Sequence, residues 1–371
     1  MHHNILLFYS KLAHICQYFI TSRNKQFQKN LVKYRYARYN DISFITLKEY
    51  IYASIIFYLR IFLCRISMFK RSNRRRTPTN EENVSPINLH ITYTHKDDML
   101  HISADKGWGY RNSNSISMFM RAFNIIREGI TFDFSLDIST NDGTYTDDVL
   151  AYANREGKNA VLIPDFVFAG WPECGIDNYD ETCRQIAEAG AKPYIYNKIF
   201  WIGNSSTNHI REELMIKGDT NNNFEFISMN WTGYEKREDR ASRLRATKYI
   251  SLPDHTQYKY LIDVPGYGYS ARVKLLMFSN RPLFYVARAE EEFYMKDLKP
   301  YIHYIPVKAD LSDLEEQYQR AEEHSQEAKQ IAANALEYAQ KNLTSKAAIL
   351  KYATILENYL YYNKKTKETS H

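Results

Sequence analysis

Residues 258–274 of this 371-residue chain read YKYLIDVPGYGYSARVK, and this stretch decides the expected fold. The apolar run 260–264 has the length of a strand and ends at Pro265 and Gly266. A loop with two glycines follows, Ser270 is a possible cap for a helix, and a second strand-like run covers 282–286. The order strand, loop, helix, strand predicts a βαβ unit with parallel strands.

The loop of this unit combines groups that can bind a diphosphate. Backbone N–H groups, a helix start, the Ser270 hydroxyl and the Arg272 guanidinium are expected to lie close together. Taken alone, a Gly-x-Gly is more often a simple turn, and an arginine early in a helix is more often a solvated charge. The residues by themselves therefore leave both interpretations open.

As a whole, residues 258–307 resemble glycosyltransferase family 90. The resemblance rests on the order Tyr-Lys-Tyr-Leu, Gly, Ser-x-Arg-x-Lys and then LKPYIHYIPV at 298–307, and it extends over roughly residues 108–342. The family contains protein O-glucosyltransferases, capsule-type xylosyltransferases and bacterial lipopolysaccharide-A-type transferases, of which the bacterial type is expected here. It implies an α/β fold that is GT-B-like, with two Rossmann-like lobes and a cleft between them.

Composition adds a third part to this architecture, because residues 1–76 carry a net charge of +13 within an overall charge of +6. The expected parts are a basic, apolar-aromatic helical leader at 1–76, a linker at 77–88, an acceptor-side lobe at 89–190, a nucleotide-sugar-binding lobe at 191–310, C-terminal helices that cross back at 311–362, and a frayed tail at 363–371.

The leader suggests contact with a membrane surface. Run 50–69 approaches spanning length, but Arg60 and Arg65 would each cost about 2.5–3.5 kcal/mol near the bilayer centre. A helix lying on anionic lipid is therefore favoured over a single-pass anchor, a helical bundle packed on the lobes, or nucleic-acid binding. The expected location is cytoplasmic, peripheral to the inner face of the membrane, with no nucleic acid as partner.

A carboxylate after the predicted strand 132–138 is the expected catalytic base. Asp142 stands before Gly143, and α/β sheets present their chemistry at the carboxyl ends of strands. The residues alone indicate an Asp-Gly turn, whereas the resemblance assigns Asp142 as the base. Because the family usually has an aromatic residue and a proline next, Asp137 and Asp147 remain alternatives.

The resemblance also assigns residues on both sides of the cleft. The donor positions are Asn204, Ser205, Thr207, Arg211, Gly266, Tyr267, Gly268, Tyr269, Ser270, Ala271, Arg272 and Glu292. The acceptor and sugar positions are Tyr110, Arg111, Phe168, Gly170 and Trp171, although the aromatic loop that carries Phe168 and Trp171 could equally form core packing. The family usually has an arginine before Gly203, where this chain has Ile202.

The implied reaction moves a hexose or pentose from a UDP-sugar to a hydroxyl of a glycan or lipid-linked glycan acceptor, with inversion. It needs a base, stabilisation of the leaving diphosphate and alignment of the two substrates. The adjacent pairs at 97–98 and 147–148 lack Asp-x-Asp spacing, so Arg211, Arg272 and loop amides are expected to stabilise the charge without a metal or cofactor. The alternative is a catalytically inactive, membrane-tethered nucleotide-sugar or glycan-binding module.

Overall fold

The computed structural model describes residues 88–105, 109–142, 149–154, 159–229, 245–246 and 250–369. The chain divides into two units, 1–82 and 83–371, and every described residue belongs to the second. The predictions for the leader 1–76 and for the linker up to residue 87 lie outside the described residues. Within the described part, no helix combines the length and apolar character needed to cross a membrane.

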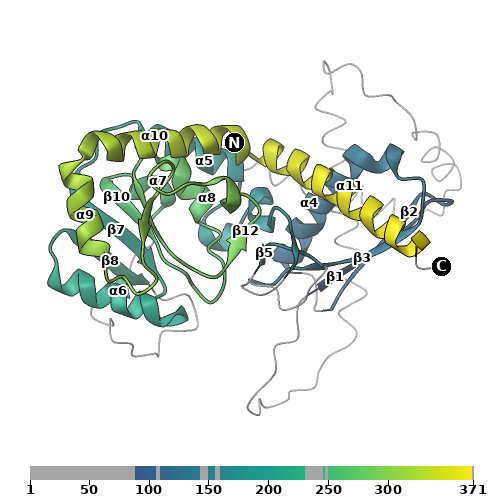
Figure 1. The fold of residues 1–371 in the computed structure, drawn as a ribbon, viewed down its shortest axis with the longest axis horizontal. Helices are drawn as coiled ribbons and strands as arrows, with labels where there is room; N and C mark the ends of the chain where they lie inside the picture. The colour runs from purple at the N-terminus through teal and green to yellow at the C-terminus, as the bar shows by residue number, and fades with distance from the viewer. Residues whose placement is uncertain are drawn as a thin grey trace, which may run out of the picture. The chain divides into compact units, whose positions relative to one another are not determined.

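The first lobe contains a five-stranded mixed sheet in the order β2-β1-β3-β4-β6 (Figure 1). Strands β1 (Asn88–Thr94), β2 (Met99–Ala104) and β3 (Phe134–Ser139) pair antiparallel, while β3, β4 (Leu150–Ala151) and β6 (Val161–Leu162) pair in parallel. Helix α4 (Tyr110–Ile126) packs Phe123 against Tyr93 and Phe134 of this sheet. The antiparallel strands distinguish this lobe from a purely parallel Rossmann sheet.

The second lobe contains a six-stranded parallel sheet in the order β13-β11-β10-β7-β8-β9. Its strands are β7 (Tyr196–Gly203), β8 (Phe224–Met229), β9 (Arg245–Ala246), β10 (Tyr258–Asp263), β11 (Leu283–Val286) and β13 (Ile305–Val307). Strands β10 and β11 pair in parallel, with Leu261 opposite Leu283. The predicted α/β class and the βαβ unit at 258–286 are therefore confirmed.

Helices cover both faces of this second sheet, as expected for parallel strands that are buried throughout. Alternate residues of β7 and β10 belong to different cores: Trp201 and Ile262 pack with α6 (His209–Thr220) and α9 (Leu314–Glu323), whereas Phe200 and Leu261 pack toward α5 (Tyr179–Gly190) and α7 (Leu252–His255). The strict period of two along a strand produces this division.

The helix expected after Ser270 differs from the prediction. Helix α8 covers only Val273–Leu276, and it continues as a 3-10 turn at Met277–Ser279. Ser270 does not cap it, because its hydroxyl donates to Asp263 Oδ1 at 2.9 Å. A single helical turn offers little dipole, so the loop must bind any anion through side chains and loop amides.

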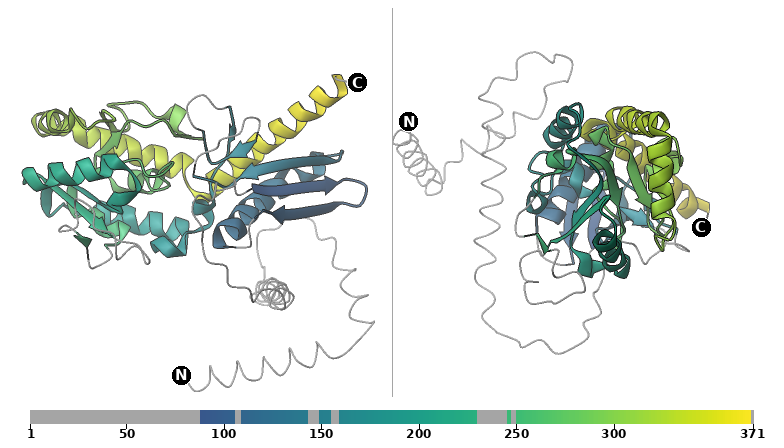
Figure 2. Two further views of the ribbon diagram at one scale, coloured as in Figure 1. Left: turned by 90° about the horizontal axis from the view of Figure 1, so that it is seen from below. Right: turned by 90° about the vertical axis from the view of Figure 1, so that its left-hand side faces the viewer.

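The C-terminal segment also differs in detail. The first part of the helical segment expected at 311–362 is divided into α9 and α10 (Ser325–Asn342), because His324 leaves the helical conformation with φ −107° and ψ 49°. Helix α11 (Ser345–Thr369) packs along α4 of the first lobe, so the chain returns to this lobe after α10 (Figure 2). It continues through residues expected to be frayed, where the Lys364 ammonium lies 4.7 Å from the Phe132 ring centre.

A buried ion-pair cluster joins the two lobes. Lys274 of α8 donates to Asp165 at 2.8 Å and to Glu292 at 3.2 Å, and the Lys274 side chain has no exposed surface. Nearby, β12 (Glu291–Glu292) pairs antiparallel with β5 (Ala153–Asn154). Since an unpaired buried charge is costly, these contacts tie the first lobe to the loop that follows β10.

Candidate functional site

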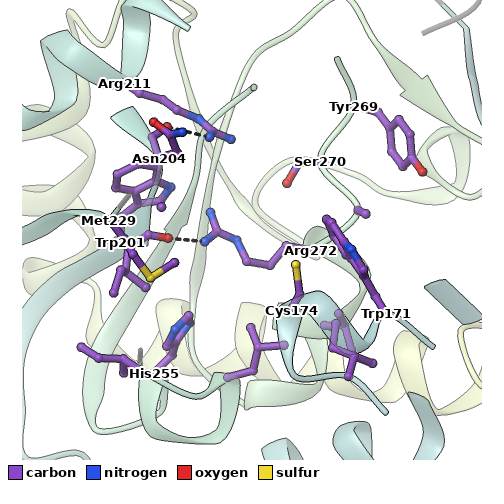
Figure 3. A pocket seen from close by; sticks show the side chains of 17 residues that line it. Trp171, Cys174, Trp201, Asn204, Arg211, Met229, His255, Tyr269, Ser270 and Arg272 are labelled. Carbon is purple, nitrogen blue, oxygen red and sulfur yellow. Dashed lines mark hydrogen bonds between the residues drawn. The ribbon is translucent and has the colours of Figure 1, made fainter. Parts of the chain in front are cut away.

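A cavity of about 710 Å³ opens between segments of the two lobes (Figure 3). The first lobe contributes Trp171, Cys174 and Ile176 to its lining. The second lobe contributes Trp201, Ile202, Gly203, Asn204, Arg211, Met229, Ile250, Leu252, His255, Tyr269, Ser270, Ala271, Arg272 and Leu275. Its volume is typical of a site for a small molecule or cofactor.

The cavity lies where ligands bind in open α/β sheets. Its walls include the carboxyl ends of β7 and β8 and the loop after β10. The chain builds the sheet from β7 through β8 to β9 on one side, and from β10 through β11 to β13 on the other. The strand order thus reverses between β7 and β10, which is the switch point at which such sheets bind ligands.

Arg272 is held at the cavity wall by a buried carboxylate. Its Nε and Nη2 donate to Asp263 Oδ1 at 3.2 and 3.1 Å, and its Nη1 donates to the Ile202 carbonyl at 2.7 Å. Asp263 also accepts from Ser270 at 2.9 Å and from Arg288 at 2.7 Å. Burial alone would raise the pKa of Asp263, but the guanidinium groups of Arg288 and Arg272 lower it.

Arg211 reaches the same wall from the start of α6. It donates through Nη1 to the Asn204 carbonyl and the Thr207 hydroxyl at 3.0 and 2.8 Å, and through Nε to the Pro265 carbonyl at 2.9 Å. A Cβ added at Gly266 would lie 2.9 Å from Arg211 Nη2, so only glycine allows this approach without a shift.

The two cavity arginines lie near one aromatic ring. The guanidinium carbons of Arg211 and Arg272 are 5.4 and 5.9 Å from the Trp201 ring centre. Burial, and then the charge of Arg272, lower the pKa of Arg211 to about 9. An anion bound at both groups would relieve this repulsion, so the wall favours a negatively charged ligand.

Asp142 lies against the loop that carries Arg272. The Tyr269 N–H donates to the Asp142 carbonyl at 2.9 Å, and a Cβ at Gly268 would lie only 2.2 Å from that same oxygen. The Asp142 carboxylate accepts from Arg111 Nη2 at 2.8 Å. Asp142 does not itself line the cavity, but the structure brings it to the edge of the loop that does.

Several polar atoms of cavity-lining residues have no hydrogen-bond partner in the described part of the chain. They are Trp171 Nε1, Trp201 Nε1, His255 Nε2 and the Tyr269 hydroxyl, and all four atoms are buried. Leaving a buried polar group unpaired costs about 1–3 kcal/mol. Such groups are therefore candidates for pairing with a ligand in the cavity.

Comparison with known proteins decides the family. Residues 138–369 match the model for glycosyl transferase family 90. The chain belongs to this family. It is 26% identical to human protein O-glucosyltransferase 1 over 229 residues, which are 58% of this chain and 58% of that protein. It is 29% identical to Danio rerio protein O-glucosyltransferase 2 over 163 residues, which are 44% of this chain and 32% of that protein.

The chain thus spans between about a third and three-fifths of the length of these family 90 relatives. Among solved structures, sucrose-phosphate synthase from Thermosynechococcus elongatus aligns with a TM-score of 0.35 and 13% identity, over 47% of this chain and 49% of that one. Anabaena HepE in complex with UDP-glucose aligns with a TM-score of 0.34 and 10% identity, over 48% and 52%. Likenesses this distant say nothing about the site.

Many donor positions assigned by the family 90 resemblance converge on the cavity. Those that line it are Asn204, Arg211, Tyr269, Ser270, Ala271 and Arg272. Gly266 and Gly268 allow close approach to Arg211 and Asp142, and Thr207 accepts from Arg211. Tyr267 is 70% exposed.

Of the six assigned donor positions outside the lining, two have side chains that are engaged elsewhere in the fold. Ser205 is buried, and its hydroxyl pairs with that of Ser228 at 2.7 Å. Glu292 belongs to the buried cluster with Lys274, and burial raises its pKa to about 7. In this structure both side chains are engaged in packing and ion pairing within the fold rather than at the cavity.

The positions that the family 90 resemblance assigns to the acceptor side do not all lie at the cavity. Trp171 lines the cavity, and Gly170, with φ +128°, forms the turn before it. Phe168 is fully buried, with its ring centre 4.8 Å from that of Tyr179, as the alternative of core packing expected. Arg111 holds Asp142, while Tyr110 begins α4 and its side chain is outside the described part.

The two alternative bases are placed differently from Asp142. Asp137 lies on the exposed face of β3 and pairs with His90 Nδ1 at 2.7 Å, away from the cavity lining. Asp147 lies outside the described residues. Of the two carboxylates that the structure describes, Asp142 is the one that it brings to the loop after β10.

Trp201 and His255 line the cavity but were not predicted as site residues. Their positions in the sequence gave a weak signal. Trp201 is in the apolar run of β7, a pattern that is typical of a core residue. A single histidine before a strand, such as His255, more often has a structural role. Their position at the cavity depends on the reversal of strand order, which no local sequence pattern reveals.

Proposed function

We propose that the protein is a glycosyltransferase that moves a hexose or pentose from a UDP-sugar to a hydroxyl of a glycan or lipid-linked glycan. Membership of family 90 supports sugar transfer. The observation that carries the proposal is the pair Arg211 and Arg272, which lie near Trp201 at the switch point of the parallel sheet. Two guanidinium groups in one cavity match the charge of a diphosphate.

Both arginines retain hydrogen-bonding capacity for phosphate oxygens. A guanidinium has five N–H groups. Within the described part, Arg272 uses three of them on Asp263 and Ile202, and Arg211 makes four hydrogen bonds to loop oxygens. The remaining N–H groups, together with the Trp201 indole N–H, can donate to a leaving diphosphate as its charge grows.

Asp142 is the proposed base. Its carboxylate is 39% exposed, and Arg111 holds one oxygen at 2.8 Å, so lone pairs remain for the proton of an acceptor hydroxyl. Attack on the side opposite the leaving diphosphate would invert the anomeric centre. Arginines already hold one oxygen of Asp142 and both oxygens of Asp263, which supports charge stabilisation by guanidinium groups rather than by a metal or another cofactor.

The acceptor and the place of action belong to the same proposal. The +13 charge of residues 1–76 supports binding to an anionic membrane, at the cytoplasmic face where lipid-linked glycans and lipopolysaccharide precursors would be reached. Sedimentation of the full chain with phosphatidylglycerol vesicles, and its loss in high salt, tests this part. Equal binding to phosphatidylcholine vesicles would contradict it.

Release of UDP from UDP-glucose, UDP-galactose or UDP-xylose by the full chain, with and without EDTA, tests the reaction. Turnover of one of these sugars that persists in EDTA is expected. Tight UDP binding without any turnover, with or without glycan acceptors, would favour the inactive binding module. Turnover that EDTA abolishes would contradict the metal-independent scheme.

A further inference from the structure

One wall of the cavity carries a histidine whose Nε2 has no partner in the described part of the chain. His255 ends α7 and is only 4% exposed. Its ring packs edge-on against Phe200, with centres 5.0 Å apart at 65°. It lines the same cavity as Arg272, and Figure 3 shows both side chains at this wall.

The protonation of His255 follows from its second ring nitrogen. A hydrogen bond with the backbone of Ile250 raises the pKa of His255, which is the effect of a carbonyl that accepts a ring N–H. Because Nε2 is the unpaired atom, this bond belongs to Nδ1. Burial, and then the charge of Arg272, lower the pKa of His255 to about 3 overall, so the ring is neutral at pH 7. Nε2 therefore presents a lone pair and can only accept.

The surroundings of this acceptor suit a flat ring. The cavity lining includes Met229, Ile250, Leu252 and Leu275, which offer apolar surface. The charged groups of the lining are Arg211 and Arg272, and Figure 3 shows Arg211 beside Asn204, away from His255. A nucleotide can therefore place its phosphates at the arginines and its base at His255.

We infer that His255 selects the nucleobase of the donor, with Nε2 accepting a hydrogen bond from a ring N–H such as N3–H of uracil. This inference rests on the proposed function, because it takes the cavity to be the nucleotide-sugar site. At neutral pH, N3 of uracil carries a hydrogen, whereas N3 of cytosine carries a lone pair. Cytosine would thus set two lone pairs against each other, and the site would prefer UDP to CDP.

Calorimetric titration of UDP and CDP into the full-length chain tests the inference. The wild type is expected to bind UDP more tightly than CDP. His255→Phe keeps a ring but removes the hydrogen-bond acceptor. The affinity for UDP should therefore fall about 5- to 100-fold, while the affinity for CDP changes little. His255→Gln can turn either its carbonyl or its NH₂ toward the base, so it should bind both nucleotides similarly. His101→Phe, at an exposed histidine of β2, is the matched control and should behave as wild type.

The outcomes separate this inference from the proposed function. Equal weakening of UDP and CDP in His255→Phe would overturn it, since Nε2 would then bind a group common to both nucleotides, such as a ribose hydroxyl. A UDP preference that survives both His255 substitutions would also overturn it, while leaving the UDP-sugar proposal intact. A wild-type chain that binds neither nucleotide would overturn the proposed function itself.

A second measurement covers the case in which the variants fail to fold. In the ¹⁵N spectrum of the wild-type chain, His255 should be recognisable as an imidazole that stays neutral, with hydrogen on Nδ1, at pH 5. Its Nε2 resonance should move upfield when UDP is added and stay in place with CDP. A resonance that ignores UDP would overturn the inference without any substitution.

Discussion

Two carboxylates meet arginines at this site in contrasting environments. Asp263 is completely buried and bonds to Arg272, Arg288 and Ser270. Asp142 is 39% exposed and bonds to Arg111, which is itself 27% exposed. The first arrangement fixes guanidinium groups before any ligand arrives, whereas the second leaves a carboxylate accessible to a substrate.

This difference in exposure indicates which carboxylate supports binding of the leaving group and which one accepts the proton. Preorganised donors stabilise developing charge without having to rearrange, so the side of Asp263 suits the leaving diphosphate. A base must meet the proton of an incoming hydroxyl, so the side of Asp142 must stay open. Substitutions on the two sides are therefore expected to separate turnover from nucleotide binding.

The largest effect is expected from Asp142→Asn. Removing the base should lower turnover about 10²- to 10⁴-fold, while UDP affinity stays within a few-fold, because the cavity arginines are untouched. UDP release and UDP titration measure the two quantities on the same protein. Asp137→Asn, on the exposed face of β3, is the matched control, and a similar loss of turnover in that variant would shift the role of base away from Asp142.

Next in size is Lys274→Met, which removes the cation that joins the two sides. Asp165 and Glu292 would remain buried without their partner, so the free energy of unfolding should fall by about 3–5 kcal/mol. Urea denaturation provides the measurement. Lys198→Met breaks the half-exposed pair with Glu225 and should cost only about 0–1 kcal/mol. Equal losses of unfolding free energy in both variants would show that the buried cluster does not stabilise the contact between the lobes.

Arg272→Lys keeps the charge but loses the fork that bonds to Asp263 and Ile202. Since charge-assisted hydrogen bonds contribute about 1.5–3 kcal/mol, UDP affinity should fall roughly 10- to 100-fold. Uridine, which has no phosphates, should bind as it does to the wild type. Arg184→Lys on the exposed face of α5 serves as control. If the affinities for uridine and UDP fell equally, Arg272 would not contact the diphosphate.

Gly268→Ala should disturb the contact between the two sides. Its Cβ would lie 2.2 Å from the Asp142 carbonyl, so the loop must move, at a cost of about 1–3 kcal/mol in unfolding free energy. Turnover should fall more than UDP affinity. A Cβ at Gly109 meets nothing within 4 Å, so Gly109→Ala should have little effect. A fully active Gly268→Ala enzyme would show that this contact does not align the base.

The last effect concerns pH. The pKa of His255 is lowered to about 3 by burial and by Arg272, against an ordinary value of 6.5. The unfolded chain therefore binds the proton first, and stability present above pH 6.5 is lost as the pH falls toward 3, by at most about 1.4 kcal/mol per pH unit. His255→Gln should flatten this part of the dependence in urea denaturation at pH 7 and pH 4.5. An unchanged slope would mean that His255 titrates normally.

Local patterns in the sequence were enough to predict the fold class. Strands β10 and β11 follow directly from apolar runs that lie next to Pro265 and Pro282. The shortness of α8 was not predictable, because Ser270 bonds to Asp263 instead of capping the helix. Nor was the break at His324, since the apolar periodicity continues through it.

Several residues that the motif predicted line the cavity, whereas cavity residues contributed by distant segments were not predicted. Arg211, Arg272 and Asp142 came from the family resemblance, and the structure brings them to one loop system. Glu292 was expected at the cavity, but its carboxylate accepts a hydrogen bond from Lys274, which lies 18 residues earlier in the chain. The environment of Asp263 depends on Arg288, 25 residues away, and such contacts between segments leave no local pattern.

A crystal structure of the full-length chain with UDP would test the central claim most directly. We predict that the diphosphate lies within hydrogen-bonding distance of both Arg211 and Arg272, with the uracil beside His255 and the β-phosphate facing Asp142. A diphosphate bound away from both guanidinium groups would contradict it.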